Sequence, residues 1–112
     1  AALLSVRERD KQGVVELGRM LSDMGFDIVA THGTAQYLAK NGVSCRRANK
    51  VREGRPHIVD MIKNGEIALI CNTTEGKQAI LDSASIRRSA LQHKVSYTTT
   101  ISGAEAAVMA AA

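Results

Sequence analysis

The chain alternates between short apolar runs and longer segments in which apolar residues return at helical spacing. The first apolar run, Leu3-Leu4-Ser5-Val6, predicts a buried strand, and Arg7 to Lys11 predicts a charged turn after it. The next segment predicts a helix that ends at Gly25, a residue typical of the position after a helix end. The apolar positions of this helix are Val14, Val15, Leu17, Leu21 and Met24.

The same alternation continues along the rest of the chain. Phe26 to Ala30 predicts a second strand, Thr34 to Lys40 a short helix closed by Asn41-Gly42, and Cys45 to Lys50 a short extended piece. A polar loop is predicted over Val51 to Pro56, followed by a helix over His57 to Lys63 that is stopped by Asn64-Gly65 and has Ile58, Met61 and Ile62 on its inward face. A strand over Ile67 to Cys71 comes next, and then a helical region over Lys77 to His93 with a break near Asp82-Ser83. The last elements are a strand over Val95 to Thr98 and a helix from Ala104 to Ala112.

This order of elements predicts an α/β fold, because strands that alternate with helices form parallel βαβ units. We expect a sandwich of three layers, helix, sheet and helix. At 112 residues the chain is long enough for one core but not for two, so residues 1–112 are predicted to be one domain. The absence of an initiator Met and the start on an apolar run indicate a piece of a longer polypeptide.

Composition and charge exclude several classes of function. The net charge is +4 and the isoelectric point is about 9.4, but the basic residues are dispersed, and one Phe with two Tyr offers too few rings to stack on nucleic-acid bases. No apolar run approaches the ~20 residues of a membrane span, and no basic region followed by a long apolar stretch opens the chain, so a secretion signal is not expected. Cys45 and Cys71 have no metal-binding or redox spacing, so we interpret them as reduced thiols of a cytoplasmic protein. His32, His57 and His93 show no paired ligand spacing, so no metal site is predicted.

The stretch Ala30-Thr31-His32-Gly33-Thr34-Ala35 is the strongest candidate for chemistry. It follows a predicted strand and opens a predicted helix, where free N–H groups and the helix dipole favour an anion. Gly33 allows close backbone approach, and Thr31 and Thr34 add hydroxyl donors. This pattern predicts a ligand that carries phosphate. The alternative is that Thr34 is only an N-cap and Gly33 only a turn residue.

Polar residues also follow the other predicted strands. In parallel α/β folds, ligands bind beyond the carboxyl ends of the strands, so these side chains are expected to converge. Hydroxyls, an amide and a lysine suit a phosphate together with a sugar or a base edge. The converging residues are Ser5 and Lys11, Thr31 and Thr34, Asn72, Thr73 and Thr74, and Thr98, Thr99 and Thr100, with Lys50 as a further cation.

Several motifs, in order and over essentially the whole chain, resemble the C-terminal regulatory domain of the bacterial carbamoyl phosphate synthetase large subunit. The most specific are Asn49-Lys50-Val51, Glu53-Gly54-Arg55-Pro56-His57 and Ile86-Arg87-Arg88. The others are Leu3 to Glu8, Asp10-Lys11, Ala30 to Ala35, Ile62 to Glu66, Asn72-Thr73-Thr74, Asp82-Ser83 and Tyr97 to Thr100.

The resemblance implies a methylglyoxal-synthase-like fold, with a five-stranded parallel sheet between helices. It implies that the domain binds the inhibitor UMP and the activator IMP at overlapping sites and is not itself catalytic. Carried over by position, the effector phosphate would meet Lys11, Thr31, Thr34 and Lys50. The ribose and base would meet Asn72, Thr73, Thr74 and Asp82. Ser5, Val51, Ile58 and Ile86 would line the pocket, and Thr99 would lie near an ornithine site at the junction with a synthetase domain.

The resemblance also implies the properties of a parent enzyme in pyrimidine and arginine biosynthesis. That parent is an ATP-dependent ligase that hydrolyses glutamine, with Mg or Mn and K as its ions, and its partners are the other synthetase domains and a small glutaminase subunit. The domain itself is expected to need no cofactor and to contact no nucleic acid or membrane. Gly76 is followed by Lys77-Gln78 where better-known members have two arginines, so affinity or selectivity is expected to differ.

Two other functions remain open. Methylglyoxal synthase shares the implied fold and uses a catalytic aspartate, but Arg55 aligns with that aspartate here, and a guanidinium cannot serve as a general base. The second alternative is a structural domain that only self-associates and binds neither nucleotide.

Overall fold

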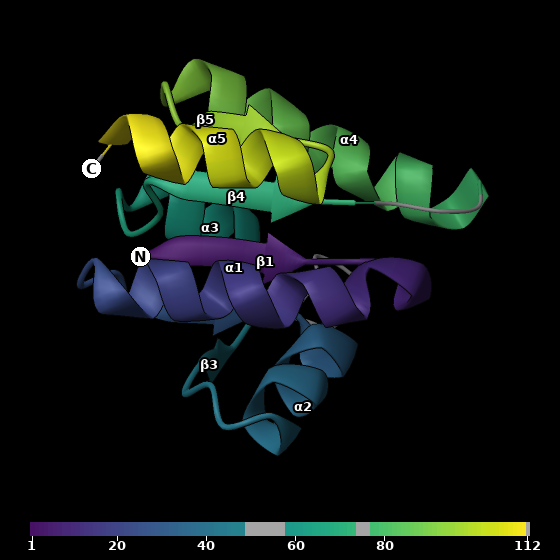
Figure 1. Ribbon diagram of the computed structural model, residues 1–112. Coiled ribbons are helices and arrows are strands. Elements are labelled where there is room, and N and C mark those ends of the chain that lie inside the picture. Colours follow the sequence, from purple (N-terminus) through teal and green to yellow (C-terminus); the bar gives the residue numbers. More distant parts are fainter. Residues whose placement is uncertain (49–57, 74–76, 112) are drawn as a thin grey trace.

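The computed structural model describes residues 1–48, 58–73 and 77–111, with only the backbone described for residues 77–83 and 111. Five strands alternate with helices along the described chain (Figure 1). In order, the elements are β1 (Ala2–Ser5), the 3₁₀ turn η1 (Glu8–Asp10), α1 (Lys11–Asp23), β2 (Ile28–Ala30), α2 (His32–Lys40), β3 (Arg46–Arg47), α3 (Ile58–Lys63), β4 (Leu69–Asn72), α4 (Lys77–Gln92), β5 (Ser96–Thr98) and α5 (Ile101–Ala111).

The strands form one five-stranded parallel sheet in the order β3-β2-β1-β4-β5. Strand β1 is central, and its Leu3 is in register with Val29 of β2 and Ile70 of β4. These three side chains are buried on one face, and Ala2 and Leu4 are buried on the other, so the run Ala2-Leu3-Leu4 of β1 is apolar without interruption. The predicted α/β sandwich with a five-stranded parallel sheet is therefore confirmed.

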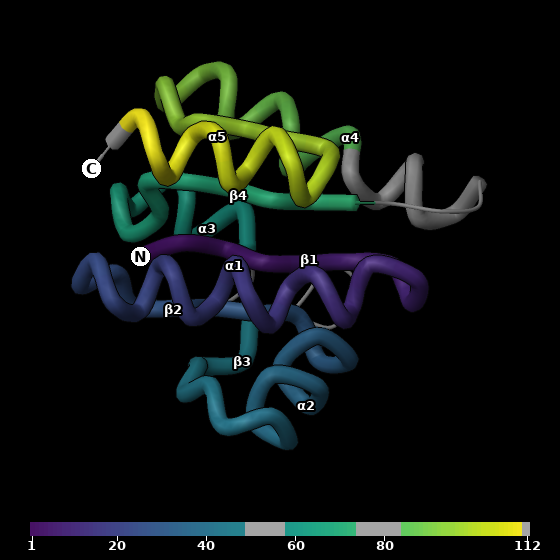
Figure 2. The backbone as a smooth tube through the Cα atoms, in the orientation of Figure 1, coloured from purple at the N-terminus to yellow at the C-terminus, as the bar shows by residue number. Residues whose placement is uncertain are grey.

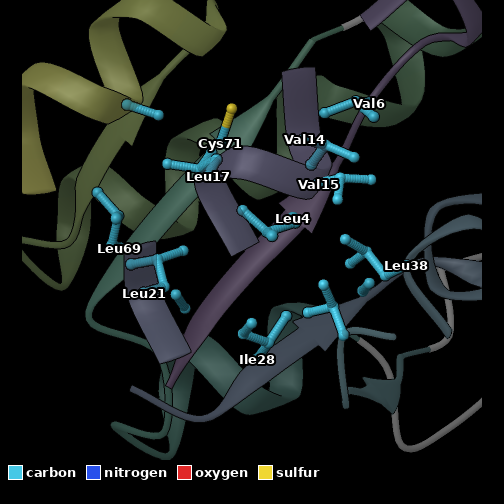
Figure 3. Packing of buried hydrophobic residues seen from close by; sticks show 14 of the residues in the cluster. Leu4, Val6, Val14, Val15, Leu17, Leu21, Ile28, Leu38, Leu69 and Cys71 are labelled. Atoms are coloured by element: carbon cyan, nitrogen blue, oxygen red, sulfur yellow. The ribbon is translucent and has the colours of Figure 1, made fainter. Parts of the chain in front are cut away.

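Two hydrophobic clusters lie on opposite faces of the sheet, because successive side chains of a strand point to opposite sides. On one face, Leu4 of β1 and Ile28 of β2 pack with buried residues of α1, α2 and α5, and Figure 3 shows α1 laid across these strands. On the other face, Leu3 packs with Ile58 and Ile62 of α3 and with residues of α4. Figure 1 shows α1 and α5 in front of the sheet and α3 behind it.

Helices α1 and α2 approach each other closely at Gly18. A Cβ atom at Gly18 would lie 3.2 Å from both Leu38 Cδ2 and Val43 Cγ1, so this position of α1 has room for a glycine but little more. Close packing of this kind compresses little, so it fixes neighbouring elements in one arrangement. Gly18 therefore helps to hold α2, and with it the start of α2, against the rest of the domain.

The predicted helix stops are confirmed. Gly25 follows α1 with φ +88° and Gly42 follows α2 with φ +81°, a left-handed conformation that glycine adopts at little cost. The N–H of Phe26 donates to the carbonyl of Leu21 at 3.0 Å, which closes the end of α1.

Three predicted helix boundaries were wrong. Helix α2 begins at His32 with Thr31 at its N-cap, so Thr34 lies inside the first turn rather than at the cap. Helix α4 is continuous and has no break at Asp82-Ser83, because an Asp or Ser inside a helix costs less than ~1 kcal/mol and a long helix tolerates it. Helix α5 begins at Ile101, and Thr100 Oγ1 accepts a hydrogen bond from the Gly103 N–H at 3.0 Å.

Candidate functional site

The strand order of the sheet reverses between β1 and β4, and the carboxyl ends of these two strands lie side by side. From β1 the chain proceeds to β2 and β3 on one side, and it then crosses to β4 and β5 on the other. Figure 2 shows that β1 and β4 end at the same side of the molecule. Ligands of open α/β sheets bind at such a reversal, so this edge is the candidate functional site.

The two threonines of the predicted anion motif fasten the start of α2 to the end of β1. Thr34 Oγ1 accepts a hydrogen bond from the Val6 N–H at 3.1 Å, and Thr31 Oγ1 donates to Ser5 Oγ at 3.0 Å. Thr31 and Thr34 are 4% and 2% exposed. Both hydroxyls therefore have a structural role, and Thr34 keeps its own proton to donate.

Lys11 lies against the first turn of α2. A Cβ atom built on Gly33 would stand 3.2 Å from the Lys11 ammonium nitrogen, so the absence of a side chain at Gly33 makes room for this cation. Lys11 begins α1 and Gly33 belongs to α2, so the tertiary fold brings the two together. A lysine and the N-terminus of a helix then face the same region, which is a favourable arrangement for an anion.

A carboxylate already pairs with this lysine. The Lys11 ammonium donates to Glu8 Oε2 at 2.9 Å, and the Glu8 side chain is 86% exposed whereas that of Lys11 is 17% exposed. An ion pair with so exposed a partner contributes only about 0–1 kcal/mol. The pairing therefore orients the ammonium and yields readily to a stronger anion.

Arg7, Asp10 and Thr73 fix the turn that carries Lys11. The Arg7 guanidinium Nε donates to Asp10 Oδ2 at 2.6 Å, and the Arg7 backbone N–H donates to Thr73 Oγ1 at 2.9 Å. Burial raises the pKa of Asp10, but hydrogen bonds from Arg7 and Thr73 and the positive charge of Arg7 and Arg9 outweigh it, so the pKa lies below its ordinary value. Asp10 is therefore ionised at neutral pH and holds the turn in place.

The end of the candidate site away from α2 lies on the face of the sheet that α3 and α4 cover. Ser5 and Asn72 are register partners on β1 and β4, and the Asn72 side chain, 3% exposed, donates from Nδ2 to the Tyr97 hydroxyl at 3.0 Å. Ile58 of α3 and Ile86 of α4 are both buried in the hydrophobic cluster of this face. Asn72 is two residues from Ile70 of this cluster on β4, so the polar strand ends lie on the same face of the sheet as the cluster.

Cys71 lies near this edge on β4, whereas Cys45 precedes β3 at the opposite edge of the sheet. Both are free thiols, and burial raises the pKa of Cys71 to about 11 and that of Cys45 above its ordinary value. Cys71 is buried and donates from Sγ to the Thr100 carbonyl at 3.8 Å. Thr99, predicted to lie near an ornithine site, is exposed between β5 and α5.

Part of the predicted site lies outside the residues that the structure describes. Lys50, Val51 and Thr74 lie outside the described residues, and so does the side chain of Asp82. Among the residues that are described, no group of three or more His, Cys, Asp or Glu side chains could hold a metal ion. No helix of the described chain is long and apolar enough to cross a membrane.

Sequence reasoning missed the contacts of Glu8, Asp10 and Tyr97. The first two could have been found, because Glu8–Lys11 and Arg7–Asp10 stand three residues apart, a spacing at which opposite charges meet on a helical turn. The pairing of Tyr97 with Asn72 has no local signal, since the two residues come from different strands.

The chain is similar to known proteins over nearly its whole length. A family model described as "MGS-like domain" matches residues 13–99. The carbamoyl phosphate synthase large chain of Xanthomonas axonopodis pv. citri is 60% identical over 107 residues, which are 96% of this chain and 10% of that protein. The protein of the same name from Pseudomonas syringae pv. tomato is 59% identical over 105 residues. The chain thus spans about a tenth of the length of these relatives.

Solved structures share the fold at low sequence identity. Methylglyoxal synthase from Elizabethkingia anophelis superposes with a TM-score of 0.75 at 14% identity, and the match covers 96% of this chain and 76% of that one. The structure of ForH gives a TM-score of 0.68 at 18% identity, covering 96% and 77% of the two chains. The sequence match and the shared fold agree. This chain belongs to the MGS-like domain family, and its close sequence relatives are carbamoyl phosphate synthase large chains.

Proposed function

We propose that this chain is the effector-binding regulatory domain of a carbamoyl phosphate synthetase large subunit, and that it binds the nucleotides UMP and IMP at the carboxyl edge of its sheet. The observation that carries the proposal is the position of the Lys11 ammonium against Gly33 in the first turn of α2. The relatives named carbamoyl phosphate synthase large chain support the assignment to that enzyme.

The phosphate of the nucleotide would occupy the space that Lys11 and α2 share. Lys11 contributes a positive charge, and the first-turn N–H groups of α2, which have no partner within the helix, contribute directional donors. Thr34 adds a hydroxyl proton, because its oxygen already accepts from Val6. Lys50 is a further proposed phosphate contact. Thr31 would join these contacts by turning its hydroxyl proton from Ser5 to the phosphate.

The nucleoside would lie towards Asn72 and the opposite face of the sheet. The Asn72 amide both donates and accepts, so it suits a ribose hydroxyl or the polar edge of a base. Ser5 lies beside it in register, and Ile58 and Ile86 belong to the apolar cluster of the same face. The Thr73 hydroxyl accepts a hydrogen bond from the Arg7 N–H and so fixes the turn after β1, next to the proposed nucleoside position. Thr74, Val51 and Asp82 are further proposed contacts, and Thr99 is proposed to lie near an ornithine site.

We propose that the domain binds without catalysing a reaction. Proton abstraction from dihydroxyacetone phosphate needs a carboxylate base, and Arg55 aligns with the base of methylglyoxal synthase. Asp10 is a poor substitute, because two hydrogen bonds hold its carboxylate and its pKa is lowered. Regulation would be measurable only in the whole cytoplasmic enzyme, which contains the ATP-dependent synthetase domains and the glutaminase subunit. There the effector site and the active sites would be coupled by a free energy of typically ~1–3 kcal/mol.

Calorimetric titration of the chain with UMP, IMP and inorganic phosphate tests this proposal. We expect saturable binding of at least one nucleotide, clearly tighter than that of phosphate. In the Lys11→Gln variant, nucleotide affinity should fall by about tenfold or more, as expected for loss of a charge-assisted hydrogen bond. Lys40→Gln is the matched control, because it removes the same charge from the last turn of α2, where Lys40 is exposed.

Two results would count against the proposal. Production of methylglyoxal from dihydroxyacetone phosphate would indicate a lyase of the kind whose fold this chain shares. Self-association in sedimentation experiments, with no binding of either nucleotide at millimolar concentration, would favour a purely structural domain.

A further inference from the structure

We infer that Tyr97 is a positioning residue for Asn72, and that it holds the Asn72 amide in the orientation that meets the nucleoside part of an effector. This inference rests on the proposed function, because it concerns a residue of the same site. It goes beyond that function because Tyr97 is given no contact with the ligand. The hydroxyl of Tyr97 acts on binding only through the Asn72 amide.

The register of the sheet makes this contact possible. On β4, Ile70 and Asn72 point to the same face, and Ile70 is the register partner of Tyr97 on β5. Tyr97 is therefore the diagonal neighbour of Asn72, at a separation that a long aromatic side chain can span. The hydroxyl accepts from Asn72 Nδ2 at 3.0 Å.

Both partners are restrained from other directions. The Tyr97 ring packs against the hydrophobic cluster of the α3–α4 face, and the guanidinium carbon of Arg87 lies 5.8 Å from the ring centroid. A cation at this distance from an aromatic ring is attracted by the electron density of its face. The packed Tyr97 ring therefore holds its hydroxyl in a fixed position beside the amide of Asn72, a residue that is 3% exposed.

The same face carries a second hydrogen-bonded pair at the neighbouring strand ends. Thr31 of the β2–α2 junction donates to Ser5 of β1, and Asn72 of β4 donates to Tyr97 of β5. Ser5 and Asn72 are themselves register partners, so the gap between the two pairs coincides with the reversal point of the sheet. A ligand at that point would meet a serine and an amide whose outer neighbours hold them in place.

A rigid amide matters for binding because an unfixed side chain must lose rotational freedom when the ligand arrives. Removing the Tyr97 hydroxyl leaves the Asn72 side chain freer in the unbound domain, and that freedom opposes nucleotide binding. Inorganic phosphate has no nucleoside and should be insensitive to this change. The two ligands therefore separate an effect at Asn72 from a general distortion of the site.

The test is calorimetric titration of the Tyr97→Phe variant with UMP and IMP, with inorganic phosphate measured as a competitor. Phenylalanine keeps the ring and its contact with Arg87 and removes only the hydroxyl. We expect nucleotide affinity to fall about three- to tenfold, the usual effect of one hydrogen bond, and phosphate affinity to stay within about twofold. Tyr37→Phe is the matched control, because Tyr37 is the only other tyrosine and packs on the opposite face of the sheet.

A double-mutant cycle tests whether Tyr97 acts through Asn72. In the Asn72→Ala background, Tyr97→Phe should cause no further loss of nucleotide affinity, because the amide that it positions is absent. Arg87→Met is a second variant that loosens the ring without touching the hydroxyl, and it should weaken nucleotide binding in the same direction. Arg88→Met, at the exposed neighbouring position, is its control.

The outcomes separate this inference from the proposed function. Wild-type binding of a nucleotide together with unchanged affinities in Tyr97→Phe overturns the role of Tyr97 and leaves the proposed function intact. An equal loss for nucleotides and phosphate, or full additivity with Asn72→Ala, also overturns it. Failure of the wild-type chain to bind either nucleotide overturns the proposed function and this inference together.

Discussion

The Lys11 ammonium donates to the Glu8 carboxylate at 2.9 Å and stands beside Gly33 in the first turn of α2. The Glu8 carboxylate thus occupies the ammonium group that the phosphate of the proposed ligand would bind. A phosphate that binds there has to displace Glu8 or share the ammonium with it.

Replacing Glu8 with Gln is expected to tighten the binding of UMP, IMP and phosphate together. The substitution removes a competing negative charge while it keeps the size of the side chain. Because an exposed ion pair contributes about 0.2–1 kcal/mol, the gain should be at most about fivefold. Calorimetry measures it, and Glu16→Gln, which removes a carboxylate paired with Arg19 elsewhere on α1, is the control. Weaker binding in Glu8→Gln would mean that Glu8 itself helps to hold the ligand.

Replacing Gly33 with Ala is expected to weaken phosphate binding and to leave the fold intact. The new Cβ would lie 3.2 Å from Lys11 Nζ, so the flexible ammonium must shift by a few tenths of an ångström away from the first turn of α2. Gly33 is helical without positive φ, and alanine in a helix is favoured over glycine by roughly 0.5–1 kcal/mol, so thermal stability should hold or rise. Thermal unfolding and calorimetry together check this. A loss of stability along with affinity would assign the effect to packing instead.

Replacing Thr34 with Val is expected to destabilise the domain by about 1–3 kcal/mol, because the buried Val6 N–H would lose the oxygen that accepts its hydrogen bond. Thr34→Ser keeps a hydroxyl at the same place and should recover most of that stability. Denaturant unfolding of the two variants measures the difference. If serine fails to recover stability, the methyl group of Thr34 rather than its hydroxyl is the important part.

Asp10 should make the domain sensitive to acid. Its pKa is lowered in the folded chain, so its contribution to stability is complete above the ordinary value of 3.8 and is lost as the pH falls through the lower folded value. Asp10→Asn should therefore unfold more easily at neutral pH, by about 1 kcal/mol for the weakened hydrogen bonds, and should lose less stability below pH ~4 than the parent. Unfolding curves at several pH values test this, with the exposed Asp23→Asn as control. Parallel pH profiles for Asp10→Asn and the parent would contradict it.

Local patterns were sufficient for most of the architecture. Apolar spacing located each strand and helix of the described chain to within a few residues, because a buried face leaves its period in the sequence. The glycines after α1 and α2 marked the helix ends correctly, since few other residues adopt positive φ cheaply. The start of α2 at His32 was missed, because Thr31 and Thr34 are both good cap residues and the pattern does not distinguish them.

The sequence by itself determined which residues stand at the carboxyl ends of the strands, and therefore which side chains were candidates for a site. Only the tertiary structure decided what those side chains do there. Val6 meets Thr34 across 28 positions, Asn72 meets Tyr97 across 25, and Arg7 meets Thr73 across 66. Periodicity describes one element at a time, whereas these partners are chosen by strand order and register, which are settled only when the whole sheet is packed.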